Sequence, residues 1–120
     1  MDAHYNMGLV LYKQGLIEEA KKHYLQALGI KPDYKEAHNS LGVALDKNGR
    51  TKEAIEHYMQ ALRIKPDFEE AHNNLAVSLI RKGYLERAKF HFRKALEINP
   101  DYVPAKKNLN KALIMQKQKK

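Results

Sequence analysis

The chain has 120 residues, enough for a single domain, and no cysteine, which excludes a disulfide framework and thiol chemistry. It has no apolar run near the roughly 18 residues of a membrane span and no signal segment at its start, so we expect a cytoplasmic protein. The net charge of +8 is uneven, because residues 103–120 hold six lysines and no acidic residue. The pattern predicts a nearly neutral domain with a basic C-terminal segment.

The chain repeats itself with a period of 34 residues, over residues 1–34, 35–68 and 69–102. Eleven positions of the period hold the same residue in all three copies. In the first copy these are Ala3, His4, Leu11, Gly15, Ala20, His23, Ala27, Leu28, Ile30, Pro32 and Asp33. A fixed period of this length is typical of a solenoid, in which each unit buries its apolar face against its neighbours.

Each copy is predicted to form two helices. A glycine follows the first helix, because its backbone can adopt the positive φ that closes the last turn. A proline follows the second helix, because it cannot donate the next backbone hydrogen bond. The glycines are Gly15, Gly49 and Gly83, and the prolines are Pro32, Pro66 and Pro100. The second helices are predicted to begin near Glu18, Lys52 and Glu86.

Three helix starts carry capping signals. Thr51 is predicted to cap the second helix of the second copy, because its hydroxyl oxygen can accept an unpaired backbone N–H. Asp33 with Glu36, and Asp67 with Glu70, have the spacing of a capping box for the helices that follow them.

A last helix is predicted over residues 103–118, with Pro104 in its first turn. Its apolar residues Ala105, Leu109, Ala112 and Leu113 continue the stripe of the repeats, whereas lysines occupy its other side. We expect this helix to close the open end of the array with a polar outer face.

The residues of the period resemble the tetratricopeptide repeat (TPR) family. That pattern has a large residue, Leu-Gly and another large residue on a first helix, then small, aromatic and small residues on a second helix, then Pro. In the second copy these are His38, Leu41, Gly42, Leu45, Ala54, Tyr58, Ala61 and Pro66. The chain departs from the pattern in two ways. His4, His38 and His72 stand where Trp is usual, and Ala76 replaces Gly in the third copy.

The resemblance implies an all-α fold, a right-handed superhelix of three TPR helix-turn-helix repeats with a C-terminal capping helix. The repeats are predicted at residues 1–34, 35–68 and 69–102, the capping helix at 103–118, and a single domain over 1–120. The resemblance also implies a protein-interaction module without catalytic activity. Such a module binds an extended peptide or protein segment in the concave groove that the first helices line.

Three rows of side chains are expected along this groove, at repeated positions on the first helices. One row holds Asn6, Ser40, Asn74 and Asn108, so Ser40 interrupts a row of amides, although Asn39 is adjacent to it. A carboxamide both donates and accepts hydrogen bonds, so this amide row can pair with a peptide backbone. It is similar to the asparagine ladder in the TPR arrays of O-GlcNAc transferase; a merely solvated polar face is the alternative. A basic row favours acidic side chains in the ligand. The predicted peptide-binding residues are Asn6, Asn39, Asn73, Asn74 and Asn108; Leu9, Val43 and Val77; Lys13, Lys47 and Arg81; and Tyr5 and Tyr12.

Metal binding and catalysis are not predicted. The six histidines form two columns, His4, His38 and His72, and His23, His57 and His91. Packed helices lie about 8–10 Å apart, so the residues of one column cannot meet at one zinc ion. A pair across a repeat junction, such as His23 with His38, lacks a third ligand. No nucleophile and base recur together, and no Gly-rich phosphate loop precedes a helix, so we expect no enzyme and no cofactor.

One TPR function is argued against by the sequence. Chaperone-binding TPR domains hold a C-terminal carboxylate with Lys, Asn, Asn, Lys and Arg at set positions. By resemblance, these positions hold Tyr5, Leu9, Ser40, Glu70 and Asn74, or, one repeat later, Asn39, Val43, Asn74, Pro104 and Asn108. Neither set contains a cation, so we do not expect this type of co-chaperone.

Two other functions stay open. In the first, the C-terminal lysines bind nucleic acid or an anionic membrane, although residues 103–120 contain no aromatic residue to support nucleic-acid binding. These lysines are Lys106, Lys107, Lys111, Lys117, Lys119 and Lys120. In the second, the chain is a self-associating scaffold. The apolar side with Ala3, Met7 and Val10 has no preceding repeat to cover it, and such a patch marks an interaction surface.

Overall fold

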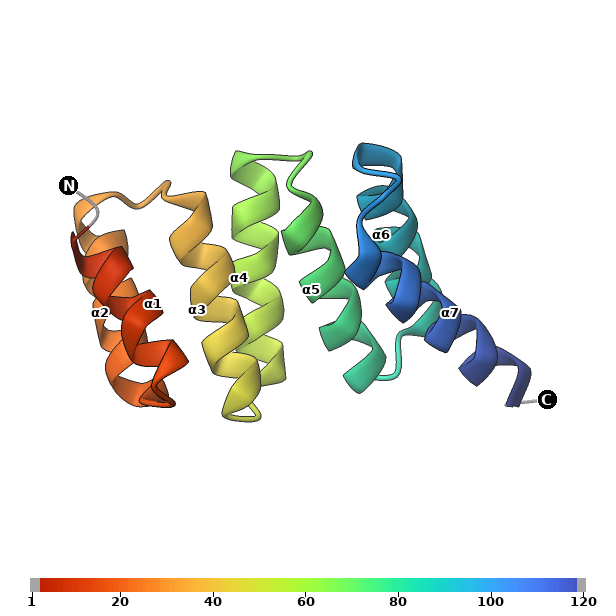
Figure 1. Ribbon diagram of the computed structural model, residues 1–120, viewed down its shortest axis with the longest axis horizontal. Coiled ribbons are helices and arrows are strands. Elements are labelled where there is room, and N and C mark those ends of the chain that lie inside the picture. The colour runs from red at the N-terminus through yellow and green to blue at the C-terminus, as the bar shows by residue number, and fades with distance from the viewer. Residues whose placement is uncertain (1–2, 119–120) are drawn as a thin grey trace.

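The computed structural model describes residues 3–118, which form seven α-helices and no strand. The helices are α1 (Ala3–Lys13), α2 (Ile17–Ile30), α3 (Lys35–Lys47), α4 (Thr51–Ile64), α5 (Glu69–Arg81), α6 (Leu85–Ile98) and α7 (Val103–Gln118). Helices α1–α2, α3–α4 and α5–α6 pack as pairs that stand in a row, and α7 follows the last pair (Figure 1). The molecule measures 48 × 26 × 21 Å. The predicted all-α helical-repeat fold is confirmed.

Each helix pair packs on the next element through its second helix. Helix α2 contacts α3, α4 contacts α5, and α6 contacts α7, and we call these contacts the first, second and third junctions. The first helices α1, α3, α5 and α7 also contact one another in order. Within residues 3–118, no Cα atoms of α2, α4 and α6 approach each other within 8 Å. The row therefore curves, with the first helices on its concave face and the second helices spread apart on its convex face.

The ends of the first helices follow the predicted glycine pattern. Gly15, Gly49 and Gly83 have φ angles of 84°, 77° and 87°. The residue after each glycine donates its N–H to the carbonyl five residues earlier, as Arg50 does to Leu45 at 2.9 Å. This bond is typical of a Schellman turn, which satisfies a carbonyl that the helix leaves unpaired.

The predicted capping boxes are wrong. The residue that precedes α3 is Tyr34, and its side chain makes no capping hydrogen bond. The first helical bond runs from the N–H of His38 to the carbonyl of Tyr34 at 3.1 Å, so the pair Asp33–Glu36 begins one residue too early. The pair Asp67–Glu70 is displaced in the same way, because Phe68 precedes α5.

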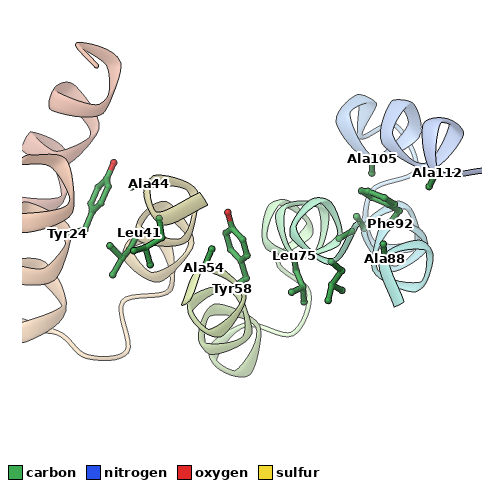
Figure 2. Close-up of a cluster of buried hydrophobic side chains, with 14 of the residues drawn as sticks. Tyr24, Leu41, Ala44, Ala54, Tyr58, Leu75, Ala88, Phe92, Ala105 and Ala112 are labelled. Carbon is green, nitrogen blue, oxygen red and sulfur yellow. The ribbon is translucent and has the colours of Figure 1, made fainter. Parts of the chain in front are cut away.

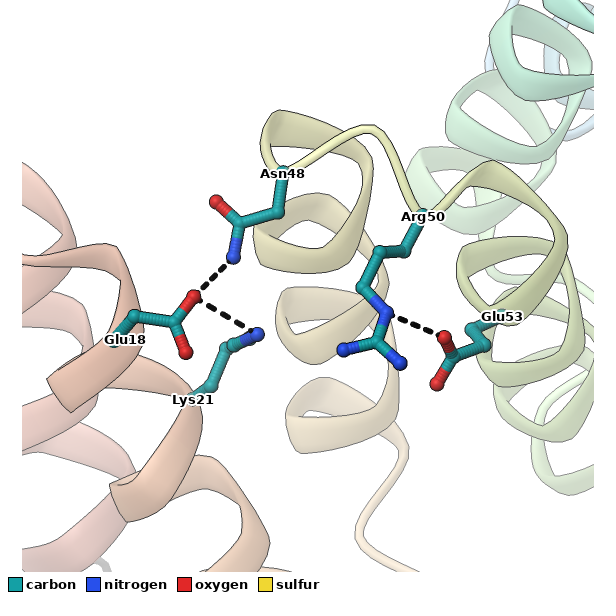
Figure 3. Close-up of polar contacts among 5 residues, drawn as sticks. All are labelled: Glu18, Lys21, Asn48, Arg50 and Glu53. Carbon is teal, nitrogen blue, oxygen red and sulfur yellow. Dashed lines mark hydrogen bonds and ion pairs between the residues drawn. The ribbon is translucent and has the colours of Figure 1, made fainter.

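The cap predicted at Thr51 is also wrong, because Thr51 is already the first residue of α4 and Arg50 occupies the cap position. The second helices begin at Ile17, Thr51 and Leu85, one residue before the predicted starts. Arg50 donates from Nε to Oε1 of Glu53 at 2.6 Å (Figure 3). This bond holds a carboxylate in the first turn of α4, where the helix dipole favours negative charge.

The first junction is tied at its edge by an exposed polar contact. Glu18 of α2 accepts a hydrogen bond from Asn48, which follows α3, and its Oε2 lies 3.1 Å from Nζ of Lys21 (Figure 3). The hydrogen bond from Lys21 lowers the pKa of Glu18. The Glu18 side chain is 70% exposed, and contacts of such solvent-exposed charges add little to stability, so the apolar core must hold the junction.

The core runs along the whole row of helices and alternates small and large side chains (Figure 2). Tyr24, Tyr58 and Phe92 of the second helices are almost fully buried beside alanines. A Cβ atom added to Gly42 would lie 2.5 Å from the ring of Tyr58, so the ring needs glycine there. Ala105 and Ala112 of α7 are fully buried and extend the core, which is the capping role predicted for this helix.

Candidate functional site

Two hollows lie side by side on the concave face. The N-terminal hollow has a volume of about 140 Å³ and the central hollow about 130 Å³, and Val43 and Asn74 line both. The N-terminal hollow is also lined by Leu9, Tyr12, Tyr24, Asn39, Ser40 and Glu70, and the central hollow by Asp46, Lys47, Tyr58, Val77 and Arg81. Each is smaller than the roughly 300–1,000 Å³ of a small-molecule pocket, and suits a single side chain.

Amide side chains connect the first helices across the junctions. Asn74 donates from Nδ2 to Oδ1 of Asn39 at 3.1 Å, and Asn108 donates in the same way to Asn73 at 3.1 Å. The acceptors Asn39 and Asn73 are buried, whereas the donors are half-buried. Each bond satisfies a buried oxygen and uses only part of the hydrogen-bonding capacity of a carboxamide. Because Asn74 lines both hollows, its other donor and acceptor sites are within reach of a ligand.

A carboxylate lies in the wall of the central hollow. Asp46 accepts a hydrogen bond from the buried hydroxyl of Ser78. Its other oxygen lies 3.0 Å from Nη1 of Arg81, an ion pair without hydrogen-bond geometry. The Asp46 side chain is 9% exposed and the Arg81 side chain 53% exposed, so the cation faces solvent. Burial, and then the charge of Asp46, raise the pKa of Tyr58, which keeps that hydroxyl protonated.

Aromatic side chains surround the N-terminal hollow. The ring centroid of Tyr5 lies 5.9 Å from that of Tyr24 and 5.0 Å from that of Tyr34. The hydroxyl of Tyr5 lies 3.2 Å from that of Ser40, at the two repeat positions that hold asparagines in the second junction. Burial, and then the neighbouring Tyr5, raise the pKa of Tyr24 to about 12, and burial also raises that of Tyr12. Apart from Glu70, the side chains that line this hollow are therefore uncharged.

The structure brings most of the predicted peptide-binding residues together. Eight line the two hollows: Leu9, Tyr12, Asn39, Val43, Lys47, Asn74, Val77 and Arg81. Tyr5 lines neither hollow, but its ring contacts Tyr24, which lines the N-terminal hollow. Asn73 and Asn108 also line neither hollow, and they form an amide hydrogen bond at the third junction. Asn6 and Lys13 are exposed on α1 and line neither hollow. Asn74 and Asn108 of the amide row are thus engaged between helices, whereas Asn6 is exposed to solvent.

Sequence reasoning missed the contribution of the second helices to the groove. Tyr24 and Tyr58 come from α2 and α4, yet they reach between the first helices and line the hollows. The sequence does contain a signal for this contribution, because one repeat position holds Tyr24, Tyr58 and Phe92 in the three copies. A buried tyrosine hydroxyl usually finds a polar partner, so the two tyrosines indicate polar surroundings that the third copy lacks.

The predicted self-association residues lie on an uncovered side of α1. Ala3, Met7 and Val10 are exposed, with 47% of Met7 and 48% of Val10 accessible. Their counterparts in α3 and α5 are buried under the preceding helix pair: Ala37, Leu41 and Ala44, and Ala71, Leu75 and Ser78. The same repeat face is therefore core in two copies and surface in the first.

The histidines meet within each helix pair and not across a junction, which the sequence did not indicate. The two Nδ1 atoms lie 3.5 Å apart in His4–His23, 3.1 Å in His38–His57 and 3.0 Å in His72–His91. No group of three or more His, Cys, Asp or Glu side chains in residues 3–118 is arranged to hold a metal ion.

The loops before α3 and α5 determine which ring nitrogen of His38 and His72 carries the proton. Nε2 of His72 lies 2.9 Å from the carbonyl oxygen of Pro66, and Nε2 of His38 lies 2.8 Å from that of Pro32. A carbonyl only accepts, so Nε2 carries the proton and, in a neutral ring, Nδ1 accepts from the partner histidine. Burial lowers the pKa of His72, and that of His91 to about 4, which keeps their pair neutral at pH 7.

The lysines of α7 form an exposed basic surface. Lys106, Lys107, Lys111 and Lys117 are exposed, and Nζ of Lys106 lies 3.9 Å from Asp101. The further predicted residues Lys119 and Lys120 lie outside the described residues. No helix in the described part of the chain is long and apolar enough to cross a membrane.

The fold and the groove define a helical-repeat interaction scaffold. Family models described as tetratricopeptide repeat match residues 1–67 and 69–102. The chain therefore belongs to the tetratricopeptide repeat family, whose repeats are generally non-catalytic protein-interaction modules. No curated protein matches its sequence.

Several solved structures have the same fold. The first TPR of Spaghetti (RPAP3), bound to an HSP90 peptide, has a TM-score of 0.91 and 19% identity over 95% of this chain and 90% of that chain. The TPR domain of Sgt2 from Aspergillus fumigatus has a TM-score of 0.92 and 19% identity over 98% and 79%. A mutant O-GlcNAc transferase from Thermobaculum terrenum has a TM-score of 0.90 and 28% identity over 93% of this chain, but only 22% of that chain. The predicted resemblance to the TPR region of O-GlcNAc transferase is confirmed.

Proposed function

We propose that the concave groove binds an extended peptide segment of a protein partner. The observation that carries this proposal is the pair of side-chain-sized hollows that share Val43 and Asn74. An extended peptide can place one side chain in each hollow while its backbone passes Asn74. The free capacity of that carboxamide suits a backbone N–H or C=O. In this proposal the module holds its partner and performs no reaction.

The charges along the groove favour one orientation of the ligand. Lys47 and the exposed guanidinium of Arg81 border the central hollow, whereas Glu70 borders the N-terminal hollow beside Leu9 and Tyr12. Lys47 and Arg81 together outweigh Asp46 in the wall of the central hollow, so an acidic side chain is favoured there, and an apolar side chain at the N-terminal hollow. Complementary charge of this kind sets specificity and association rate more than affinity.

The test begins with a peptide selected from a random linear library and synthesised with a fluorescent label. Val43→Ser removes apolar contact from both hollows, and Lys47→Glu reverses an exposed charge without disturbing the core. Each is expected to weaken binding by about 1 kcal/mol or more, roughly fivefold in Kd. Fluorescence anisotropy measures the affinity, and circular dichroism checks that both variants stay folded.

Matched changes on the convex side provide the controls. Leu25→Ser alters an apolar side chain that is 54% exposed on α2, and Lys52→Glu reverses an exposed charge on α4. Both are expected to bind the peptide normally. Unchanged affinity in both Val43→Ser and Lys47→Glu would overturn the proposed function. Asn74→Ala is less suitable, because it also leaves the buried oxygen of Asn39 without its donor.

A further inference from the structure

The convex side of the second junction holds a larger hollow, which arises because α4 and α6 spread apart. Its volume is about 280 Å³, roughly twice that of either hollow in the groove. It is lined by Met59, Leu62, Arg63, Pro66, His72, Leu75, Arg87 and His91. Its floor comes from α5, where His72 and Leu75 are 8% and 2% exposed. We call it the convex hollow.

Apolar side chains form much of the lining and part of the border of the convex hollow. Met59 of α4 is 47% exposed, and Leu62 is half-buried behind it. On α6, Phe90 is 55% exposed, and its ring centroid lies 5.1 Å from that of His91, which lines the hollow. Exposed apolar residues that gather around a depression are typical of an interaction site.

Two arginines give the lining of the convex hollow a positive charge that no ion pair among the described residues neutralises. Arg63 donates a hydrogen bond to Gln60 at 3.2 Å, and the guanidinium of Arg87 lies 5.4 Å from the ring centroid of Tyr84. Across residues 3–118, neither arginine forms an ion pair, and no acidic residue lines the hollow. The imidazoles of His72 and His91 are neutral at pH 7, so the charge comes from the two guanidinium groups.

The equivalent positions of the first junction lack this charge. Gly29 stands in place of Arg63, and Glu53 in place of Arg87. Glu53 is already paired with Arg50 at 2.6 Å, where the later copy has Tyr84 and Arg87 (Figure 3). The two arginines are therefore a property of the second junction and not of the repeat itself.

We propose that the convex hollow is a second docking site, which takes an acidic segment of a protein partner. A leucine- or phenylalanine-sized side chain packs on Leu62 and Leu75, and carboxylates beside it pair with Arg63 and Arg87. Guanidinium groups favour carboxylates because they offer a planar fork of donors. The site lies on the face opposite the concave groove, so it does not depend on the proposed groove function, and both sites can be occupied together.

The experiment uses a defined probe, a synthetic peptide with the sequence EELFEE, and its neutral counterpart QQLFQQ. NMR titration follows the methyl group of Met59 and the ring signals of His72 and His91. The acidic peptide is expected to shift these signals, and the neutral peptide is expected to bind about tenfold or more weakly. The double variant Arg63→Gly/Arg87→Glu, which copies the first junction, is expected to lose binding by about the same factor.

Two control variants separate this site from its surroundings. Arg93→Glu makes the same charge change as Arg87→Glu and also lies on α6, but at an exposed residue outside the lining. It is expected to bind the acidic peptide normally. Lys47→Glu alters only the groove, and is also expected to bind normally. The proposal is overturned if the peptide leaves the Met59 signal unmoved at millimolar concentration. It is also overturned if the double variant, folded by circular dichroism, binds normally, or if only Lys47→Glu loses binding.

Discussion

The first and second junctions share a backbone arrangement and differ in how their first helices are joined. At the first junction, the hydroxyls of Tyr5 and Ser40 lie 3.2 Å apart, and the ring of Tyr5 packs near Tyr24. At the second junction, the same two repeat positions hold Asn39 and Asn74, whose amides form a hydrogen bond at 3.1 Å. One repeat position thus carries an aromatic side chain in one copy and a buried amide in the next.

A second pair of positions differs in the same coordinated way. Tyr12 of α1 and Ala44 of α3 hold these positions at the first junction, and Asp46 of α3 and Ser78 of α5 at the second. Ser78 is fully buried, and it donates to Asp46. A mixed junction, with Ser78 facing an apolar residue, would leave a buried hydroxyl unpaired at a cost of about 1–3 kcal/mol. Each copy is therefore matched to its own neighbour.

The largest expected effect comes from breaking the polar pair of the second junction. Asp46→Ala removes the acceptor of Ser78, and is expected to lower the free energy of unfolding by about 2 kcal/mol. Urea unfolding followed by circular dichroism measures the change.

The double variant Asp46→Ala/Ser78→Ala replaces both polar residues of this pair, and gives position 78 the alanine that Ala44 provides at the first junction. It is expected to recover part of the loss, because the unpaired Ser78 hydroxyl is removed, whereas the buried Tyr58 hydroxyl then loses its own hydrogen bond to Ser78. A double variant that is less stable than Asp46→Ala would contradict the matching argument.

A smaller effect is expected from pH. Burial, and then the neighbouring His72, lower the pKa of His91 from 6.5 to about 4. Well above pH 6.5 the ring is neutral in both states, and its contribution to stability is fully present. As the pH falls from 6.5 towards 4, the unfolded chain binds a proton that the folded chain does not, so stability is lost. The melting temperature is expected to fall by several degrees over this range.

The variant His91→Phe provides the matched measurement. It keeps an aromatic ring beside His72 but cannot bind a proton, so its melting temperature should fall less between pH 6.5 and 4. Equal pH dependence in the variant and the parent would show that His91 does not cause the loss. NMR titration of the histidine rings assigns the protonation step directly.

The smallest effect on stability is expected at the face that no junction covers. Met7 of α1 is 47% exposed, whereas its counterparts Leu41 and Leu75 are buried at the first and second junctions. We predict concentration-dependent self-association through this face. Met7→Lys should abolish it and change the free energy of unfolding by less than about 0.5 kcal/mol. Sedimentation velocity at several protein concentrations measures the association.

Leu25→Lys is the control for this prediction, because Leu25 is 54% exposed but lies on the convex face and outside the lining of the convex hollow. It should self-associate like the parent chain. A parent chain that stays monomeric at high micromolar concentration would contradict the prediction.

The helices could be predicted from the 34-residue period, but their starts could not. Glycine at the end of a first helix and proline after a second helix act locally, so the sequence places them well. The starts depend on which carbonyl accepts the first helical bond. The N–H of His38 donates to Tyr34, which leaves Asp33 outside the cap position. A capping box is a weak local preference that the turn geometry overrides here.

The candidate groove could be predicted in part. Val43, Val77 and the amide row follow from helical periodicity, because a period of about 3.6 residues assigns each side chain to a face. Tyr58 was missed, because its reach into the groove depends on how closely α4 approaches α3 and α5. The pairing of His72 with His91 was missed for the same reason, since it depends on how two helices cross.

The sequence by itself determined the number and order of the helices and where the two helices of each repeat end, because these depend on local backbone chemistry and on a repeated pattern of apolar residues. The tertiary structure decided which side chains from different helices meet. The partner of Asn74, the setting of Asp46 and the opening between α4 and α6 all depend on the angle and spacing between helix pairs. Those quantities arise from packing along the whole row, and no local sequence preference specifies them.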